Sequence, residues 1–211
     1  MTLDLTSFQG TILQRKYWIF DMDGTLTVPA HDFDGIRRIL GVPAGGDILK
    51  HLAGLPEDEA HRLRDQLDEI EIDLAKQALP MEHIRTFLEM LHQSGVQMGI
   101  LTRNNLKNSL TTLQAIGFES FFNKDYIMGR DDAKPKPDPE GILKLLARWK
   151  AEPTEAVMVG DFYYDLQCGR NAGTATIHFD QTGSFPWPEQ TDIKITSFGE
   201  LVDSFSSISK N

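Results

Sequence analysis

Two aspartates, Asp21 and Asp23, directly follow an apolar run at residues 17–20. The run, YWIF, is rich in strand-forming residues, and it predicts a strand buried inside a parallel sheet. Charged side chains are costly to bury, so two carboxylates at the end of a core strand need a cation, hydrogen bonds or a chemical task. Aspartate and glycine are also common in turns, so the pair taken alone fits a plain loop equally well.

Polar side chains that could bind a cation or an anion follow three further apolar runs. The carboxyl ends of parallel strands meet at one edge of a sheet, so we expect these groups to lie near Asp21 and Asp23. Carboxylates gathered there can share a hard cation, which describes Mg²⁺, whereas the histidine or thiolate spacing of a zinc site is absent. The groups are Thr102 in ILT, Lys134 and Lys136 in AKPKPDP, and Asp161 and Asp165 in GDFYYD.

An anion with several oxygens could bind between this cation, the Thr102 hydroxyl and a lysine ammonium, and phosphate is the natural candidate. Two of these residues also have plainer interpretations. Thr102 could cap the helix that follows it, and Asp165 could be a charge that favours a helix N-terminus. For Arg103 and Asn104, which follow Thr102, we favour exposed loop positions.

The elements that must position these residues alternate along the chain. Alternation of strand and helix predicts right-handed crossovers and an α/β fold: a Rossmann-like, mainly parallel sheet with helices on both faces. The apolar runs predict strands within 17–20, 96–102, 125–129, 156–161 and 174–180, and apolar spacing predicts helices at 105–116, ended by Gly117, and at 139–149.

Residues 29–94 interrupt this alternation with helical patterns only. The segment begins just after the loop of the two aspartates and returns just before the next strand. We therefore expect a small helical cap at 29–94 and a catalytic core formed by 1–28 and 95–211. A cap in this position would cover the carboxyl end of the first strand, where lids exclude water and select substrates.

Four segments, DMDGT, ILT, KPDPEG and GDFYYD, resemble in this order the four motifs of the haloacid dehalogenase-like hydrolase superfamily. The closest resemblance is to its phosphatases similar to phosphoglycolate phosphatase. It covers about 17–28 and 95–182, and the helical insertion matches the first cap site of the family. The resemblance implies a Mg²⁺-dependent phosphatase that acts on a small phosphomonoester. An acid at position 23 favours phosphate ester cleavage over dehalogenation, because the family's dehalogenases lack it.

The resemblance also assigns a role to each candidate residue. Lys136 is favoured over Lys134 because PDPEG follows it, and a cis Lys136–Pro137 peptide bond is expected on the same grounds. The implied roles are nucleophile and metal ligand for Asp21, general acid and base with a carbonyl on the metal for Asp23, phosphate binding for Thr102 and Lys136, metal ligand for Asp161, and support of the metal site for Asp165.

Two other functions share this chemistry. A phosphomutase would form the same aspartyl phosphate and return the phosphoryl group to a sugar. A signalling receiver also joins acidic residues, threonine and lysine around Mg²⁺, but receivers lack a helical insertion after the first strand. For the phosphatase, phosphoglycolate and sugar phosphates are the expected substrates, with nucleoside monophosphates as rivals, because the cap selects the substrate.

The composition of the chain argues against several classes of function. The 211 residues carry a net charge of −10, which argues against general binding to nucleic acid or anionic membranes. Cys168 is the only cysteine, so no internal disulfide forms and a reducing compartment fits. No apolar run reaches the length of a membrane span, and the first 16 residues lack the features of a secretory signal. We expect a cytoplasmic monomer.

Overall fold

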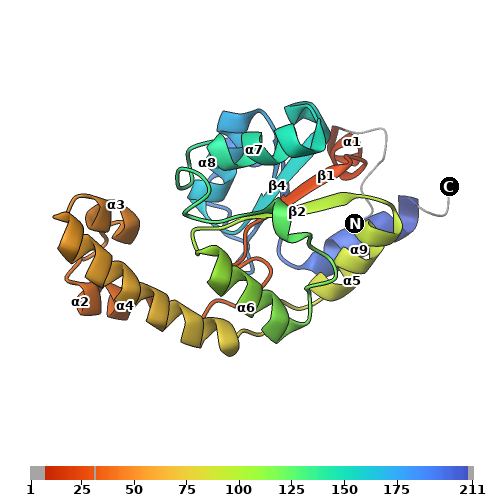
Figure 1. Ribbon diagram of the computed structural model, residues 1–211. Coiled ribbons are helices and arrows are strands. Elements are labelled where there is room, and N and C mark those ends of the chain that lie inside the picture. Colours follow the sequence, from red (N-terminus) through yellow and green to blue (C-terminus); the bar gives the residue numbers. More distant parts are fainter. Residues whose placement is uncertain (1–7, 31, 209–211) are drawn as a thin grey trace.

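The computed structural model describes residues 8–30 and 32–208. It contains a parallel sheet in the order β3-β2-β1-β4-β5-β6 with helices on both faces, which confirms the predicted α/β fold (Figure 1). The strands are β1 (Tyr17–Phe20), β2 (Gln97–Leu101), β3 (Ile127–Met128), β4 (Ala156–Gly160), β5 (Ala175–Phe179) and β6 (Ile193–Ile195). The helices are α1 (Phe8–Leu13), α2 (Phe33–Leu40), α3 (Ile48–Ala53), α4 (Glu57–Lys76), α5 (Ile84–Gln93), α6 (Leu106–Ile116), α7 (Glu140–Trp149), α8 (Tyr163–Ala172) and α9 (Phe198–Ile208).

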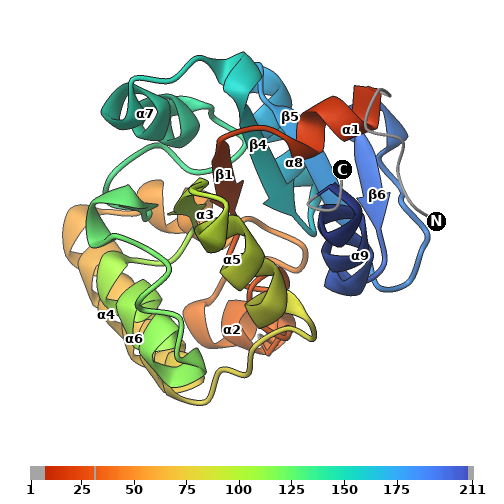
Figure 2. The same cartoon turned by 90° about the vertical axis from the view of Figure 1, so that its right-hand side faces the viewer.

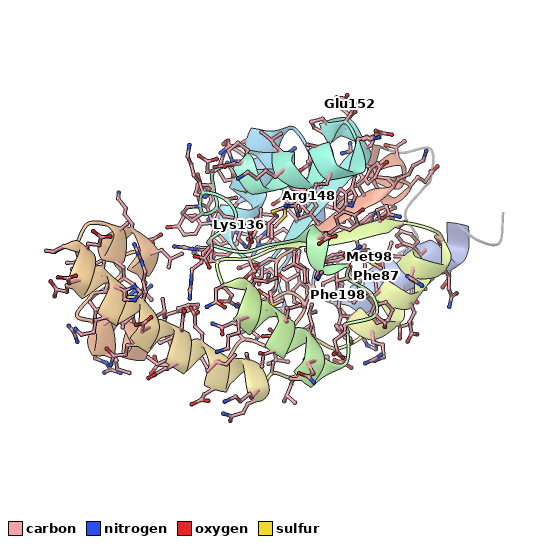
Figure 3. The ribbon with its side chains drawn as sticks, in the orientation of Figure 1. Phe87, Met98, Lys136, Arg148, Glu152 and Phe198 are labelled. Carbon is pink, nitrogen blue, oxygen red and sulfur yellow. The ribbon has the colours of Figure 1, made fainter. Side chains whose placement is uncertain are left out.

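Alternate residues of β1 serve the two faces of the sheet. Trp18 packs edge-on against Phe87 of α5 at 5.3 Å between ring centroids, and Phe87 in turn lies 6.0 Å from Phe198 of α9 (Figure 3). Ile19 points the other way and joins the cluster that includes Leu145 of α7. Both faces of β1 are therefore buried, which explains why the strand is apolar throughout rather than alternating.

The cap has a hydrophobic cluster of its own. Ile36 and Leu40 of α2, Leu52 of α3, and Leu63 and Leu67 of α4 pack together, apart from the core of the sheet. Figure 1 shows α2, α3 and the start of α4 standing away from the sheet, while the rest of α4 runs back beside α6. The expected helical cap is present.

The helix at 84–93 packs differently from the prediction. Its Phe87 and Leu91 belong to the same cluster as Trp18, and α5 lies beside α9 rather than with the cap helices (Figure 2). A helical period shows which face of a helix is apolar, but not which surface covers that face. We therefore propose a shorter cap, 29–80, and a core of 1–28 and 81–211.

The buried face of helix α6 does not contain all of its leucines. Leu106 and Leu110, two of the leucines whose spacing predicts the helix at 105–116, are 39% and 40% exposed. The buried side includes Asn108 and Thr112, and α6 packs there against α4. Gly117 ends the helix with φ +70, as expected. Over the described residues, no helix is both long and apolar enough to cross a membrane.

Candidate active site

The loop after β1 holds Asp21 against the end of the sheet. Its backbone N–H donates to the carbonyl of Val159 on β4 at 2.9 Å, and the residue is 7% exposed. Gly24 has φ +86, and a Cβ at this position would lie 2.4 Å from a carboxylate oxygen of Asp161. A residue without a side chain is thus needed for the loop to close over Asp161, which explains the glycine of DMDGT.

Lys136 lies at the centre of the site, on the side of the sheet that faces the cap (Figure 3). Its Nζ donates to Oδ1 of Asp21 and contacts Oδ1 of Asp165, both at 2.5 Å, and the residue is 5% exposed. The side chain of Lys134 is 72% exposed. The Lys136–Pro137 peptide bond is cis, as expected. The fold brings Lys136 to the aspartates and leaves Lys134 in solvent.

Three carboxylates meet beside this ammonium. Asp21, Asp161 and Asp165 each offer an oxygen within 4.8 Å of the others. Asp165 lies in the first turn of α8 and accepts a hydrogen bond from the backbone N–H of Phe162 at 3.1 Å. Thr25 donates to Asp161 at 3.3 Å. Asp165 thus supports the helix terminus and also lies in the cluster, so its two sequence interpretations are compatible.

The cluster contains more acidic groups than basic groups. Burial, followed by neighbouring carboxylates, raises the pKa of Asp161 to about 8 and that of Asp165 to about 6. Burial also raises the pKa of Asp21. Burial alone would lower the pKa of Lys136, but Asp165 and Asp21 raise it, so the ammonium keeps its charge. One ammonium does not balance three carboxylates, so this all-oxygen donor set fits a hard divalent cation such as Mg²⁺.

Asn104 links Thr102 to Asp23. Its amide Nδ2 donates to Oδ2 of Asp23 at 2.7 Å, and its backbone N–H donates to Oγ1 of Thr102 at 3.1 Å. The N-cap of α6 is Asn105, whose side chain accepts from the backbone N–H of Asn108, so the capping interpretation of Thr102 is wrong. Asn104 is 7% exposed, which also corrects its expected loop position in solvent.

Arg103 connects the core to the cap. Its guanidinium donates to both carboxylate oxygens of Asp47, at 2.7 and 2.8 Å, and lies 5.3 Å from the centre of the Tyr164 ring. Arg103 lies in the loop before α6 as expected, but its side chain is only 28% exposed rather than fully in solvent. A second link joins Arg130 of the core to Glu71 of α4 at 2.9 Å. Partners this far apart leave no signal in a single sequence.

Most of these groups line one cavity of about 450 Å³ at the carboxyl ends of β1, β2 and β4, below the cap. Apolar side chains from α2, α3 and α4 form much of its cap side. The cavity can hold a small organic phosphate next to a metal ion. The residues predicted from the sequence that line it are Asp21, Asp23, Thr102, Lys136, Asp161 and Asp165.

The chain is similar in sequence and in fold to known proteins. Residues 31–179 match the sequence profile of a family described as haloacid dehalogenase-like hydrolase. A haloacid dehalogenase-like hydrolase domain-containing protein of Arabidopsis thaliana is 31% identical over 202 residues, covering 90% of this chain and 80% of the relative. An N-acetylmuramic acid 6-phosphate phosphatase of Pseudomonas aeruginosa is 27% identical over 184 residues, covering 78% of this chain and 81% of the relative.

The fold also has a close structural counterpart. The crystal structure of a hydrolase from Geobacter sulfurreducens, assigned to subfamily IA, variant 1 of the superfamily, superposes with a TM-score of 0.64 at 22% identity. The superposition covers 90% of this chain and 98% of that one. At this identity the match establishes a shared fold, the parallel sheet with its helical cap.

Proposed function

Because the chain belongs to the haloacid dehalogenase-like hydrolase family, we propose that it is a Mg²⁺-dependent phosphatase that hydrolyses a small phosphomonoester through an aspartyl phosphate. One observation carries the proposal: a buried ammonium, a threonine hydroxyl and a cluster of carboxylates line the same cavity, with Lys136 Nζ 2.5 Å from Asp21. The name of the P. aeruginosa relative, a sugar phosphate phosphatase, supports the same class of substrate.

In the first half-reaction, a carboxylate oxygen of Asp21 attacks phosphorus and the bond from phosphorus to the leaving oxygen breaks. Asp23 donates its proton to that oxygen, so the alcohol leaves uncharged. Lys136 and Thr102 hold the oxygens of the phosphoryl group and offset the charge that gathers on them. Asn104 fixes the carboxyl group of Asp23 through its 2.7 Å hydrogen bond.

In the second half-reaction, Asp23 is a carboxylate and takes a proton from water. The water oxygen attacks phosphorus, the bond to Asp21 breaks, and inorganic phosphate leaves. Asp21, Asp161 and the carbonyl of Asp23, with Asp165 alongside, would hold a Mg²⁺ ion, which would supply positive charge to the phosphoryl oxygens. Closure of the cap excludes bulk water from the site.

The test is a panel of phosphomonoesters assayed for phosphate release with Mg²⁺ and with EDTA. We expect metal-dependent release by the unaltered protein and a loss of at least about a thousandfold in Asp21→Asn. Asp203→Asn, an exposed carboxylate on α9, is the matched control and retains full activity. Activity that survives in Asp21→Asn would exclude Asp21 as the nucleophile.

The same assay separates the two other functions. Steady release of phosphate from simple esters contradicts a phosphomutase, which must return the phosphoryl group to its sugar. An aspartyl phosphate that persists for many minutes without turnover would instead indicate a receiver. Gel filtration tests the accompanying proposal that the protein acts as a monomer.

A further inference from the structure

The cavity is larger than a short phosphoester needs. Since a molecule of liquid water takes ~30 Å³, the volume of about 450 Å³ has room for roughly fifteen water-sized groups. Phosphoglycolate, whose leaving group has two carbons, would leave much of this space to water. The residues that line the space beyond the phosphate end therefore indicate which kind of leaving group the cavity accepts.

Two of these walls present exposed aromatic rings to the cavity, one from each domain. Phe33 of the cap is 52% exposed and Phe162 of the core is 50% exposed, and both line the cavity. Single exposed apolar residues are common, but two exposed aromatic rings that line one cavity, one from the cap and one from the core, form a site that an apolar ligand would cover.

The Phe162 ring is held in position by its neighbours. It packs edge-on against Tyr164 at 5.3 Å and against Trp187 at 5.2 Å. The guanidinium of Arg103 covers Tyr164 in turn. Rings that are fixed before a ligand arrives lose little conformational freedom when it binds, so Phe162 forms a preorganised flat surface.

The cations of this outer space already have partners. Arg103 is engaged by both carboxylate oxygens of Asp47. Arg37 donates to Asp34 at 2.8 Å and to the carbonyl of Gly46 at 2.9 Å. Among the described residues that line the cavity, the lysine and arginine side chains are those of Arg37, Arg103 and Lys136. A carboxylate or second phosphate on the leaving group would have to compete with Asp47 or Asp34 for these guanidinium groups.

We infer that the preferred substrate is a phosphomonoester whose leaving alcohol is uncharged and carries a planar apolar ring, which packs between Phe33 and Phe162. This inference rests on the proposed phosphatase function and makes it more specific. It ranks a ring-bearing ester above phosphoglycolate, although the resemblance of the sequence pointed to phosphoglycolate first.

The test compares three alkyl esters, so that the reactivity of the leaving group does not decide the result: benzyl phosphate, cyclohexylmethyl phosphate and phosphoglycolate. We expect kcat/KM for benzyl phosphate to exceed that for each of the others by about tenfold or more, the value of one good aromatic contact. Equal or higher kcat/KM for phosphoglycolate or for the cyclohexyl ester would overturn the inference.

Four variants locate the effect. Phe33→Ala and Phe162→Ala are expected to lower kcat/KM for benzyl phosphate about tenfold, mainly through KM, with less than about a twofold change for phosphoglycolate. Ile39→Ala, on the same helix as Phe33 and 55% exposed, and Leu143→Ala, 45% exposed on α7, are matched controls outside the cavity and change neither ester. A uniform loss for all esters in the phenylalanine variants would contradict the stacking role.

Arg103→Met tests the charge argument. We expect it to affect the three esters alike, since Arg103 has Asp47 as its partner. A loss confined to phosphoglycolate would show that Arg103 binds a carboxylate on the leaving group, and would overturn the inference.

Binding to the Asp21→Asn protein, measured by calorimetry with Mg²⁺ present, separates this inference from the proposed function. If benzyl phosphate binds more tightly than phosphoglycolate but the unaltered protein turns over neither ester, the phosphatase proposal is contradicted and the inference about the ligand is supported. Turnover by the unaltered protein, together with tighter binding of phosphoglycolate than of benzyl phosphate, would support the phosphatase proposal and contradict the inference. If none of the esters binds, both the phosphatase proposal and the inference are contradicted.

Discussion

Lys136 and Lys134 occupy similar sequence positions but very different surroundings. Replacing Lys136 with methionine removes the ammonium that lies 2.5 Å from two carboxylates, and we expect kcat/KM to fall by about 10²–10³. Lys134→Met, at a 72% exposed side chain, is the control and is expected to stay within about twofold. Urea unfolding of both variants checks that the loss is not a folding defect. Equal, mild effects would remove Lys136 from the mechanism.

Asn104 gives a prediction that depends on the leaving group. Asn104→Leu removes the 2.7 Å hydrogen bond that helps to orient the carboxyl group of Asp23 toward the leaving oxygen. We expect kcat for alkyl esters to fall about tenfold or more, because their alcohols need a proton from Asp23. The nitrophenolate of 4-nitrophenyl phosphate leaves without one, so its release should fall much less. A purely structural role would lower kcat for both esters equally.

Cys168 should resist alkylation in the folded protein. Its thiol is fully buried and donates to the carbonyl of Asp138 at 3.1 Å, and burial raises its pKa to about 12. Only the thiolate reacts, and its fraction falls about tenfold for each unit by which the pH lies below that pKa. Labelling with iodoacetamide at pH 8 should therefore be slow in the native protein and fast in urea. Rapid labelling of the native protein would show that this part of α8 opens readily.

These residues also show what a single sequence reveals about a site. Asp21, Asp161 and Lys136 lie in short motifs at strand ends, where fold and local sequence together predict their meeting. The contact between Asn104 and Asp23 joins residues 81 positions apart, and its only sequence signal was that Asn104 closely follows Thr102. The partners of Arg103 and Arg130 depend on how the cap docks, which no local pattern encodes.

Among the cap helices, α3 has at its N-cap one of the contacts that tie the cap to the core. Asp47 accepts from the backbone N–H of Lys50 as the N-cap and also binds Arg103. Asp47→Asn keeps a good N-cap but removes the ion pair, so we expect KM to rise a few-fold with little loss of stability. Raising the ionic strength should bring the unaltered protein toward the variant.

Two further variants separate the roles of Asp47. Asp47→Ala loses the cap as well as the ion pair and should cost about 1 kcal/mol of unfolding free energy, measured in urea. Asp32→Asn is the matched control, since Asp32 caps α2 without bridging to the core. If Asp32→Asn raised KM as much as Asp47→Asn, the Arg103 contact would have no part in closing the cap.

The elements themselves were predictable to the extent that burial leaves a local pattern. β1, β2, β4 and β5 are buried on both faces, so each appears as an apolar run. β6, with only three residues and an exposed Lys194, gives no such run and was missed. α5 was recognised as a helix but given to the cap, because its stripe of Phe87 and Leu88 fits either surface equally well.

For the protein as a whole, a divalent cation bound among these acidic groups is expected to stabilise the folded state. Burial, and then repulsion among the carboxylates gathered around one ammonium, raises the pKa values of Asp161 and Asp165 in the metal-free protein. A ligand that binds only the folded state stabilises it by about 2.7 kcal/mol at a hundred times its Kd. We expect Mg²⁺ at that excess to raise Tm by roughly 5–10 °C, measured against EDTA by thermal unfolding.

Asp161→Asn tests whether this stabilisation comes from the site itself. The substitution removes one of the repelling charges, so Tm in EDTA should equal or exceed that of the unaltered protein, whereas the shift on adding Mg²⁺ should fall below about 2 °C. Asp203→Asn, which alters an exposed carboxylate on α9, should keep the full shift. Because the readout is unfolding, the result holds whatever the substrate is. An undiminished shift in Asp161→Asn would mean that Mg²⁺ binds elsewhere and that this carboxylate is not its ligand.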